Sequence, residues 1–220
     1  GREFLYNGSA PEDLQKARKL LREAKEALQG LSGEEGHRAY LLLAKVEYEL
    51  GNSHSFGDGD RGEARRHFEA ALAAAERALA LEESAEGHCL LGESLSRLIE
   101  FKGWAFAATA GPKAKKAFER ALEIDPQSAQ AHIDLGLSYL FTPKMFGGSL
   151  EKALQLLEKG LELAPDPHIR FLAHLWLSQA YQKRGEKEKV DYHLKEAKKI
   201  YPQSCLLYTS DAADEGLGVD

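Results

Sequence analysis

Eight histidines are the side chains of this 220-residue sequence that most invite a metal or catalytic site. His88, His132 and His174 stand in the same place, each three residues before a Leu-Gly or Leu-Ser pair. In stacked helices, equivalent places lie roughly 10 Å apart, whereas a zinc ion holds its ligand atoms at about 2 Å. We therefore expect these histidines to be packing residues, and we expect no metal site.

Other arrangements for chemistry are also missing from the sequence. It contains no G-x-S-x-G, P-loop or H-E-x-x-H motif, and Cys89 lies inside a helix-packing phrase. The sequence therefore predicts that the protein is not an enzyme and needs no cofactor. Lys113, Lys115 and Lys116 fall near a predicted helix N-terminus, where the helix dipole disfavours positive charge. They either bind an anionic partner or cover apolar surface with their stems.

The composition favours helix and sets limits on partners. Leu, Ala, Glu and Lys dominate, and only seven prolines interrupt them. No run approaches the roughly 18–20 apolar residues that span a membrane. The net charge of −6 gives no basic excess for nucleic acid. The chain begins at Gly1 rather than Met, so we expect an incomplete N-terminus, and bacterial cytoplasm and periplasm both stay open as compartments.

The last sixteen residues stand apart from the rest. Residues 205–220, beginning Cys205-Leu206-Leu207-Tyr208, resemble a translated transposase-type sequencing adapter. We expect a helical-repeat domain over residues 1–204, with an incomplete first repeat, and a non-native tail over 205–220; the alternative is a natural acidic C-terminus. Without the tail, 31 acidic residues face 29 basic ones, which makes the net charge −2.

One helical phrase recurs along the chain. It reads as a small residue, a large apolar residue four positions on, and another small residue three positions further. The copies span Ala17–Ala24, Ala64–Leu72, Ala114–Leu122, Ala153–Leu161 and Val190–Ala197. This spacing places the phrase on one face of a helix. Pro126, Pro165 and Pro202 follow three of the copies at the same offset, where proline ends a helix.

Partner helices between these copies carry a phrase of their own. It is a large residue followed by a small one, at Leu43-Ala44, Leu91-Gly92, Leu135-Gly136 and Leu177-Ser178. Gly51 and Gly185 follow at the same offset and are predicted to end their helices. The alternation over Pro11 to Pro202 resembles the tetratricopeptide (TPR) repeat. The resemblance implies an all-α fold, an α-α superhelix of antiparallel helix pairs, that binds protein partners.

Three stretches lengthen the repeats. Asn52–Gly62 is polar and reads as a loop, whereas Phe101–Gly111 and Thr142–Ser149 are apolar. The apolar loops either fold back to plug the superhelix or cover a pocket. The candidate lid residues are Trp104, Phe106, Met145 and Phe146.

The inserts carry a narrower resemblance. Gly111-Pro112-Lys113 and Pro143, followed by Phe146-Gly147-Gly148, are similar to bacterial TPR proteins grouped with the T component of TRAP transporters. Those proteins are thought to serve a periplasmic solute-binding partner. The resemblance implies a periplasmic accessory protein that binds a small apolar solute.

The concave face is the predicted binding surface, because the first helix of each pair lines it in such solenoids. The candidate groove residues are Leu41, Lys45, Tyr48, Glu93, Arg97, Ile133, Leu137, Leu140, Phe141, Leu175, Gln179 and Lys183. An apolar centre with polar flanks suits a protein or peptide segment. The sequence thus predicts a non-catalytic binding or scaffold protein, with the apolar solute as the alternative.

Overall fold

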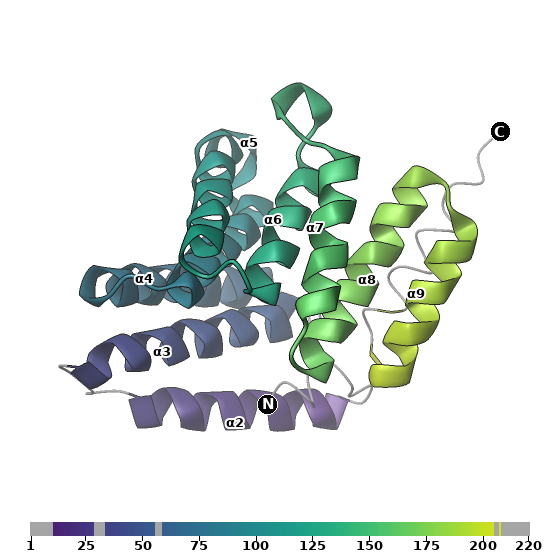
Figure 1. The fold of residues 1–220 in the computed structure, drawn as a ribbon. Helices are drawn as coiled ribbons and strands as arrows, with labels where there is room; N and C mark the ends of the chain where they lie inside the picture. Colours follow the sequence, from purple (N-terminus) through teal and green to yellow (C-terminus); the bar gives the residue numbers. More distant parts are fainter. Residues whose placement is uncertain (1–10, 29–33, 56–58, 205–206, 208–220) are drawn as a thin grey trace.

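The computed structural model describes residues 11–28, 34–55, 59–204 and 207, and the regular structure in these ranges is helical (Figure 1). The elements are α2 (Pro11–Leu28), α3 (Glu34–Ser53), α4 (Arg61–Leu81), α5 (Ala85–Ile124), α6 (Ala129–Phe141), the short 3-10 helix η2 (Lys144–Phe146), α7 (Leu150–Leu163), α8 (Pro167–Arg184) and α9 (Lys187–Ile200). Contacts are densest between α3 and α4, α6 and α7, and α8 and α9. The predicted all-α superhelix of helix pairs is confirmed.

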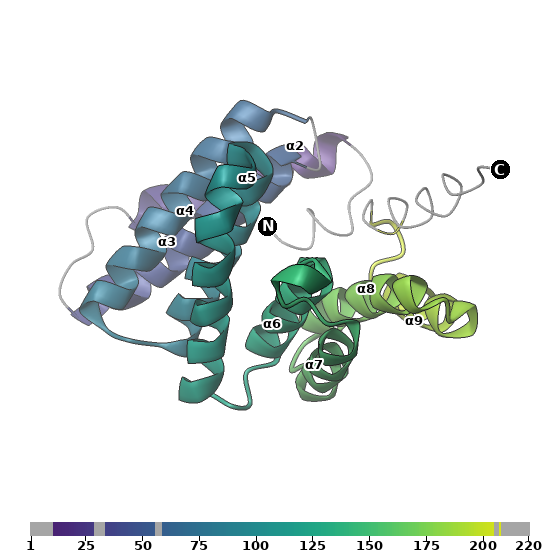
Figure 2. The ribbon, with the colours of Figure 1, turned by 90° about the horizontal axis from the view of Figure 1, so that it is seen from above.

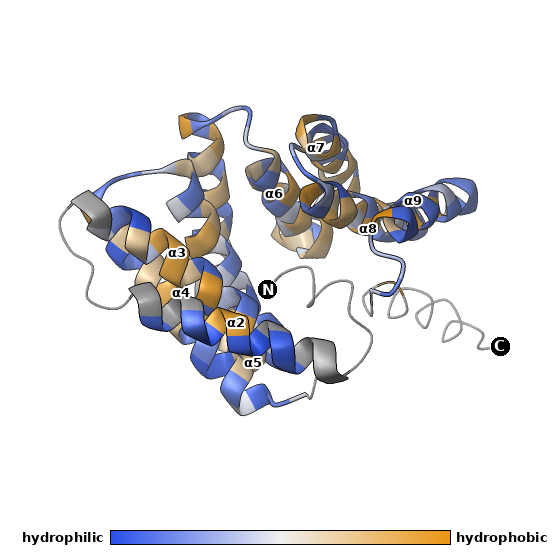
Figure 3. Cartoon of the chain, turned by 90° about the horizontal axis from the view of Figure 1, so that it is seen from below, coloured by the Kyte–Doolittle hydropathy of each residue, from blue (hydrophilic) through white to orange (hydrophobic). Residues whose placement is uncertain are grey.

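The helix pairs follow one another along a superhelix. Seen from above, α3, α4 and α5 lie side by side, and the chain turns between α5 and α6 so that α6 to α9 form the other wall (Figure 2). Contacts also join α3 to α5 and α6 to α8, so the inner helices of successive pairs are neighbours. Hydrophilic residues dominate α9, whereas α6 and α7 are more hydrophobic (Figure 3). None of the described helices is both long and apolar enough to cross a membrane.

Side-chain caps fix where several helices begin. A side-chain oxygen before the helix accepts a hydrogen bond from the backbone N–H three residues on, in α4 to α8; the capping residues are Asp60, Ser84, Ser128, Ser149 and Asp166. Each such cap stabilises its helix by about 1 kcal/mol. At the other ends, α5, α7 and α9 stop at Ile124, Leu163 and Ile200, just before the three prolines, as predicted.

A single glycine divides α5 into two helices. Gly103 has φ 76° and ψ −173°, a conformation that is essentially restricted to glycine. The ring of Phe118 lies directly against Gly92; in a straight helix these residues would be about 39 Å apart, so the two halves run antiparallel. The predicted loop over Phe101–Gly111 is therefore wrong, because helix continues on both sides of Gly103. The lysines near position 113 lie within this helix and not at its N-terminus.

The small residues of the inner helices meet large side chains of their paired helices. A Cβ on Gly51 would stand 2.6 Å from the ring of Phe68, and one on Gly136 would stand 3.0 Å from Leu157. Gly51 therefore lies inside α3 as a packing residue, and the prediction that it ends a helix is wrong. Gly185 does end α8, with φ 81°. The equivalent of Leu91-Gly92 in α3 is consequently Leu50-Gly51 and not Leu43-Ala44.

The insert between α6 and α7 is a tight turn that exposes its apolar side chains. A Cβ on Gly148 would overlap the carbonyl of Thr142, so glycine is needed there. Met145 and Phe146 are 81% and 72% exposed. The plug interpretation is therefore wrong for these two side chains.

The tail is described at one residue only. Leu207 is buried and packs against Phe171, Leu175 and Ala197. The rest of the stretch 205–220 lies outside the described residues, as do parts of the predicted polar loop at 56–58 and the side chains of Ala17 and Ala24.

Candidate functional site

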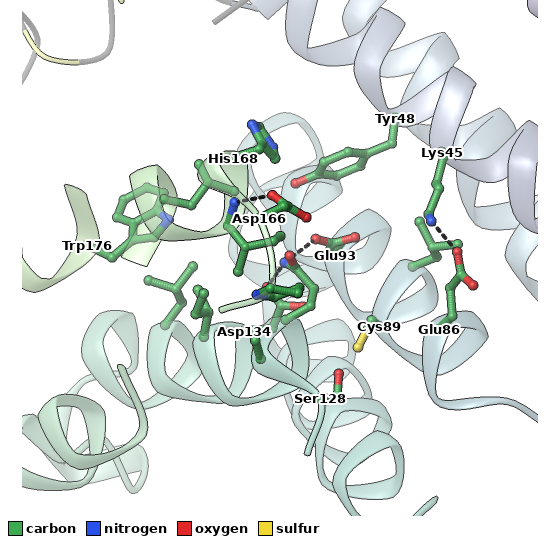
Figure 4. A pocket seen from close by; sticks show the side chains of 18 of the residues that line it. Lys45, Tyr48, Glu86, Cys89, Glu93, Ser128, Asp134, Asp166, His168 and Trp176 are labelled. Carbon is green, nitrogen blue, oxygen red and sulfur yellow. Dashed lines mark hydrogen bonds and ion pairs between the residues drawn. The ribbon is translucent and has the colours of Figure 1, made fainter. Parts of the chain in front are cut away.

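A cavity of about 660 Å³ lies between α3, α5, α6 and α8 (Figure 4). Each helix contributes the same three places, which are six and three residues before the small packing residue and one residue after it. The small residues are Gly51, Gly92, Gly136 and, in the equivalent place, Ser178. The twelve residues in these places all line the cavity: Lys45, Tyr48, Asn52, Glu86, Cys89, Glu93, Gln130, Ile133, Leu137, Leu172, Leu175 and Gln179. Because residues three and four apart share a helix face, one repeated face builds the cavity, which we call the groove.

Most of the groove residues predicted from sequence are brought together here. Those that line the cavity are Lys45, Tyr48, Glu93, Arg97, Ile133, Leu137, Leu175 and Gln179. They come from four helices that are distant in sequence. Their role in binding a partner stays a prediction.

The other four predicted residues do not line the cavity. Leu41 is buried in a core cluster with residues of α4 and α5. Leu140 is buried in the core of the α6, α7 and α8 helices. Phe141 meets the groove residue Trp176 edge-to-face, with ring centroids 6.0 Å apart, and the ammonium of Lys183 lies 4.8 Å from the Phe141 ring centroid. The last two therefore sit beside the apolar end of the groove.

Five of the twelve repeated places are absent from the predicted groove residues. They are Asn52, Glu86, Cys89, Gln130 and Leu172. The helical period would have located them, once each small packing residue was known, because these residues share its groove-facing side of the helix. Cys89 also lines the groove; burial raises the pKa of its thiol, which disfavours a reactive thiolate.

The α3 and α5 side of the groove is polar. Lys45 and Glu86 form an ion pair across these two helices. Tyr48 is half-buried, and burial first and the charge of Glu93 second raise the pKa of its phenol. The hydroxyl of Tyr48 points toward the groove carboxylates in Figure 4.

Glu93 and Asp134 form a hydrogen-bonded polar cluster with Gln130 in the groove. The side-chain amide nitrogen of Gln130 donates to an oxygen of each carboxylate, at 2.9 Å in both cases. Asp134 is only 4% exposed, and its Oδ2 has no hydrogen-bond partner. Burial first, and the negative charge of Glu93 second, raise the pKa of Asp134 well above its usual range.

The α6 and α8 side of the groove carries most of its apolar residues. Its lining residues include Ile133, Leu137, Leu175 and Trp176, with Ile169 at the start of α8. Ile133 and Leu175 are almost fully buried, so they form a fixed floor. The groove therefore changes from polar to apolar along the superhelix.

Comparisons with solved structures identify the fold. The chain is similar to the HusA haemophore from Porphyromonas gingivalis, with 23% identity, a TM-score of 0.57, and 78% of this chain and 87% of that chain covered. It is also similar to TTC0263, a thermophilic TPR protein of Thermus thermophilus, with 18% identity, a TM-score of 0.54, and 93% of this chain and 100% of that chain covered. This chain has the tetratricopeptide-repeat fold. No protein-family model matches it, and no curated protein matches it by sequence.

The predicted lid residues are not over the groove of this TPR fold. Trp104 is 86% exposed at the turn of α5, and Phe106 packs into the core between α5 and its neighbours. Neither these two nor Met145 and Phe146 line the cavity. Of these four residues, only Phe106 packs against the hydrophobic core, as the plug interpretation predicted.

The equivalent histidines of the TPR repeats hold separate local contacts. His132 Nδ1 lies 2.9 Å from the carbonyl oxygen of Ser128, His88 Nε2 lies 3.1 Å from Glu83 Oε1, and His174 pairs with His193. In the part of the chain that the structure describes, no group of three or more His, Cys, Asp or Glu residues is placed to hold a metal ion.

Proposed function

We propose that this protein is a non-catalytic binding module that holds an extended segment of a partner protein in its groove. The observation that supports the proposal is the repetition: four inner helices present the same three places to one cavity. A segment lying along the groove would contact the polar side at α3 and α5 with one end and the apolar residues of α6 and α8 with the other. Burial of one Leu- or Phe-sized side chain on that floor contributes about 1.5–3 kcal/mol.

The test uses a tryptophan of the groove as its reporter. In a Trp104→Phe background, Trp176 is the remaining tryptophan, and it lines the cavity. Peptides are selected from a random 12-residue phage library on the wild-type protein, and their affinities are measured by Trp176 fluorescence. We expect Leu137→Glu to weaken the selected peptides at least about tenfold, because a carboxylate on the groove wall opposes burial of apolar side chains.

A matched control sits on the outside of the superhelix. Gln155 is exposed on α7 and does not line the groove, so Gln155→Glu adds the same charge away from the proposed site. We expect it to leave affinity within about twofold. Equal losses in Leu137→Glu and Gln155→Glu, with helicity unchanged in both, would contradict groove binding.

The second candidate is a small apolar solute, bound by a periplasmic accessory protein of the TRAP-associated kind. The cavity volume of about 660 Å³ favours it, since small-molecule sites enclose roughly 300–1,000 Å³. Native mass spectrometry of the purified protein separates the candidates. A co-purifying small molecule that is lost in Leu137→Glu, a change on the cavity lining, supports the solute, whereas an apo protein that binds the selected peptides supports the peptide groove.

A further inference from the structure

The lining of the groove as a whole has an excess of negative charge. Six carboxylates line the cavity, and two cationic side chains, Lys45 and Arg97, accompany them. Both cations have acidic partners of their own: Lys45 pairs with Glu86, and the guanidinium of Arg97 lies 2.5 Å from Glu100 Oε1. The lining therefore favours a ligand that carries positive charge.

Two of the six carboxylates have a simple structural role. Asp166 caps α8, and Asp125 Oδ1 accepts the backbone N–H of Gln127 at 3.0 Å. Neither role applies to Asp134, which lies inside α6 and not at its N-terminus. A carboxylate oxygen that is buried without a hydrogen bond is costly in a folded protein.

The atoms around Asp134 define what would satisfy it. Gln130 uses one amide nitrogen for both carboxylates, so it holds Glu93 and Asp134 close together, and Oδ2 of Asp134 is left without a donor. Two adjacent carboxylates accept a guanidinium or an ammonium group through charge-assisted hydrogen bonds. A calcium ion needs six to eight oxygen ligands, which is more than this pair supplies.

We propose that Glu93, Asp134 and Gln130 form a subsite for the side chain of a lysine or arginine in the bound segment. This inference rests on the proposed function and adds the chemical class of the ligand to it. The apolar floor at Ile133, Leu137 and Leu175 lies next to this subsite. The preferred segment therefore carries a basic residue followed or preceded by apolar residues, and the basic residue supplies the donors that Asp134 Oδ2 lacks.

The experiment uses the phage-selected peptides described above. The tightest peptide is synthesised with its basic residue intact and with that residue replaced by glutamine, and both forms are titrated into the full chain by Trp176 fluorescence. In the Trp104→Phe background with an unchanged groove we expect the replacement to weaken binding about 10- to 100-fold. On the Glu93→Gln/Asp134→Asn double variant we expect the two peptides to differ less than about threefold, since the acceptors have lost their charge.

Controls separate this inference from the proposed function. Asp191 is an exposed carboxylate on α9 that does not line the groove, and Asp191→Asn should preserve the full difference between the two peptides. Selected peptides without lysine or arginine, or a difference that persists in the double variant, would overturn the subsite and leave the peptide groove standing. A library that yields no binder at all would overturn both. Circular dichroism of the double variant checks that it is folded; if it is not, the single Asp134→Asn variant, which changes only one buried atom, replaces it.

Discussion

At the scale of single residues, the pairing of His174 with His193 is the feature with a measurable consequence. The two Nδ1 atoms lie 2.9 Å apart, so one ring donates and the other accepts, and the accepting nitrogen carries no proton. Both rings are buried between α8 and α9, where Tyr181 stacks on His193. Burial first and the neighbouring His174 second lower the pKa of His193 from 6.5 to about 4.

The lowered pKa makes stability depend on pH. Between pH 6.5 and about 4 the unfolded chain binds a proton that the folded chain does not, so the stabilisation is complete above 6.5 and is lost as pH falls toward 4. We expect a loss of about 1–3 kcal/mol from this residue. Urea denaturation at a series of pH values measures it, and His193→Gln should flatten the slope. Lys195→Gln, an exposed change on the same helix, should leave the slope as it is; a slope unchanged in His193→Gln would refute the assignment.

At the scale of the helix pair, the contact between a small residue and a large one sets the spacing. Gly92 lies against the ring of Phe118, so Gly92→Ala forces the two halves of α5 apart. We expect it to destabilise the protein by about 1–3 kcal/mol. Gly62, in the first turn of α4, offers ordinary contact only, with Asp60 Oδ1 at 3.4 Å from an added Cβ. Gly62→Ala should therefore be neutral or stabilising by up to about 1 kcal/mol. Thermal denaturation of both variants checks the difference, and equal effects would count against the packing account.

The helices were predictable from apolar spacing, but the register of α3 was not. Leu43-Ala44 and Leu50-Gly51 both follow the large-small pattern, and they are seven residues apart, which is close to two helical turns. Two such pairs present the same helix face, so periodicity does not choose between them. The choice is made by the fit of the Phe68 ring against Gly51, a contact across two helices. Lys45 and Tyr48 line the groove, whereas Leu41 is packed in the core against α4.

The inserts show a different limit of the sequence. The stretch around Phe101 reads as a loop because it adds residues between two repeat phrases. The structure lengthens both halves of α5 instead and places the reversal on Gly103 alone. Helix propensity of the alanine-rich segment 105–110 explains why helix resumes at once. The apolar character of residues 101–111 therefore reflects a helical hairpin and not a loop that covers a pocket.

At the scale of the whole molecule, the gradient from a polar to an apolar groove arises only when the helices are assembled. The sequence predicts the apolar residues of α6, because each is apolar in its own right. It does not predict the pairing of Glu93 with Asp134, since Gln130 brings together residues from α5 and α6. Asp134 directly precedes the Leu135-Gly136 pair. A charged residue in a helix is normally taken to face solvent, so the sequence gives no reason to expect that Asp134 is buried. Burial and the unsatisfied oxygen are properties of the assembled groove.

The one-residue reversal at Gly103 has a consequence for how copies of the chain associate. An alanine at this position disfavours the reversed backbone by about 1–3 kcal/mol, while a straight α5 of 40 residues would extend over about 60 Å. A straightened chain regains the lost contact by placing its Phe118 against Gly92 of a second copy, which is a domain exchange. We expect Gly103→Ala to shift the protein toward a dimer with unchanged helicity, measured by size-exclusion chromatography with light scattering. A monomeric Gly103→Ala protein would show that the antiparallel halves, and not the glycine, hold the hairpin closed.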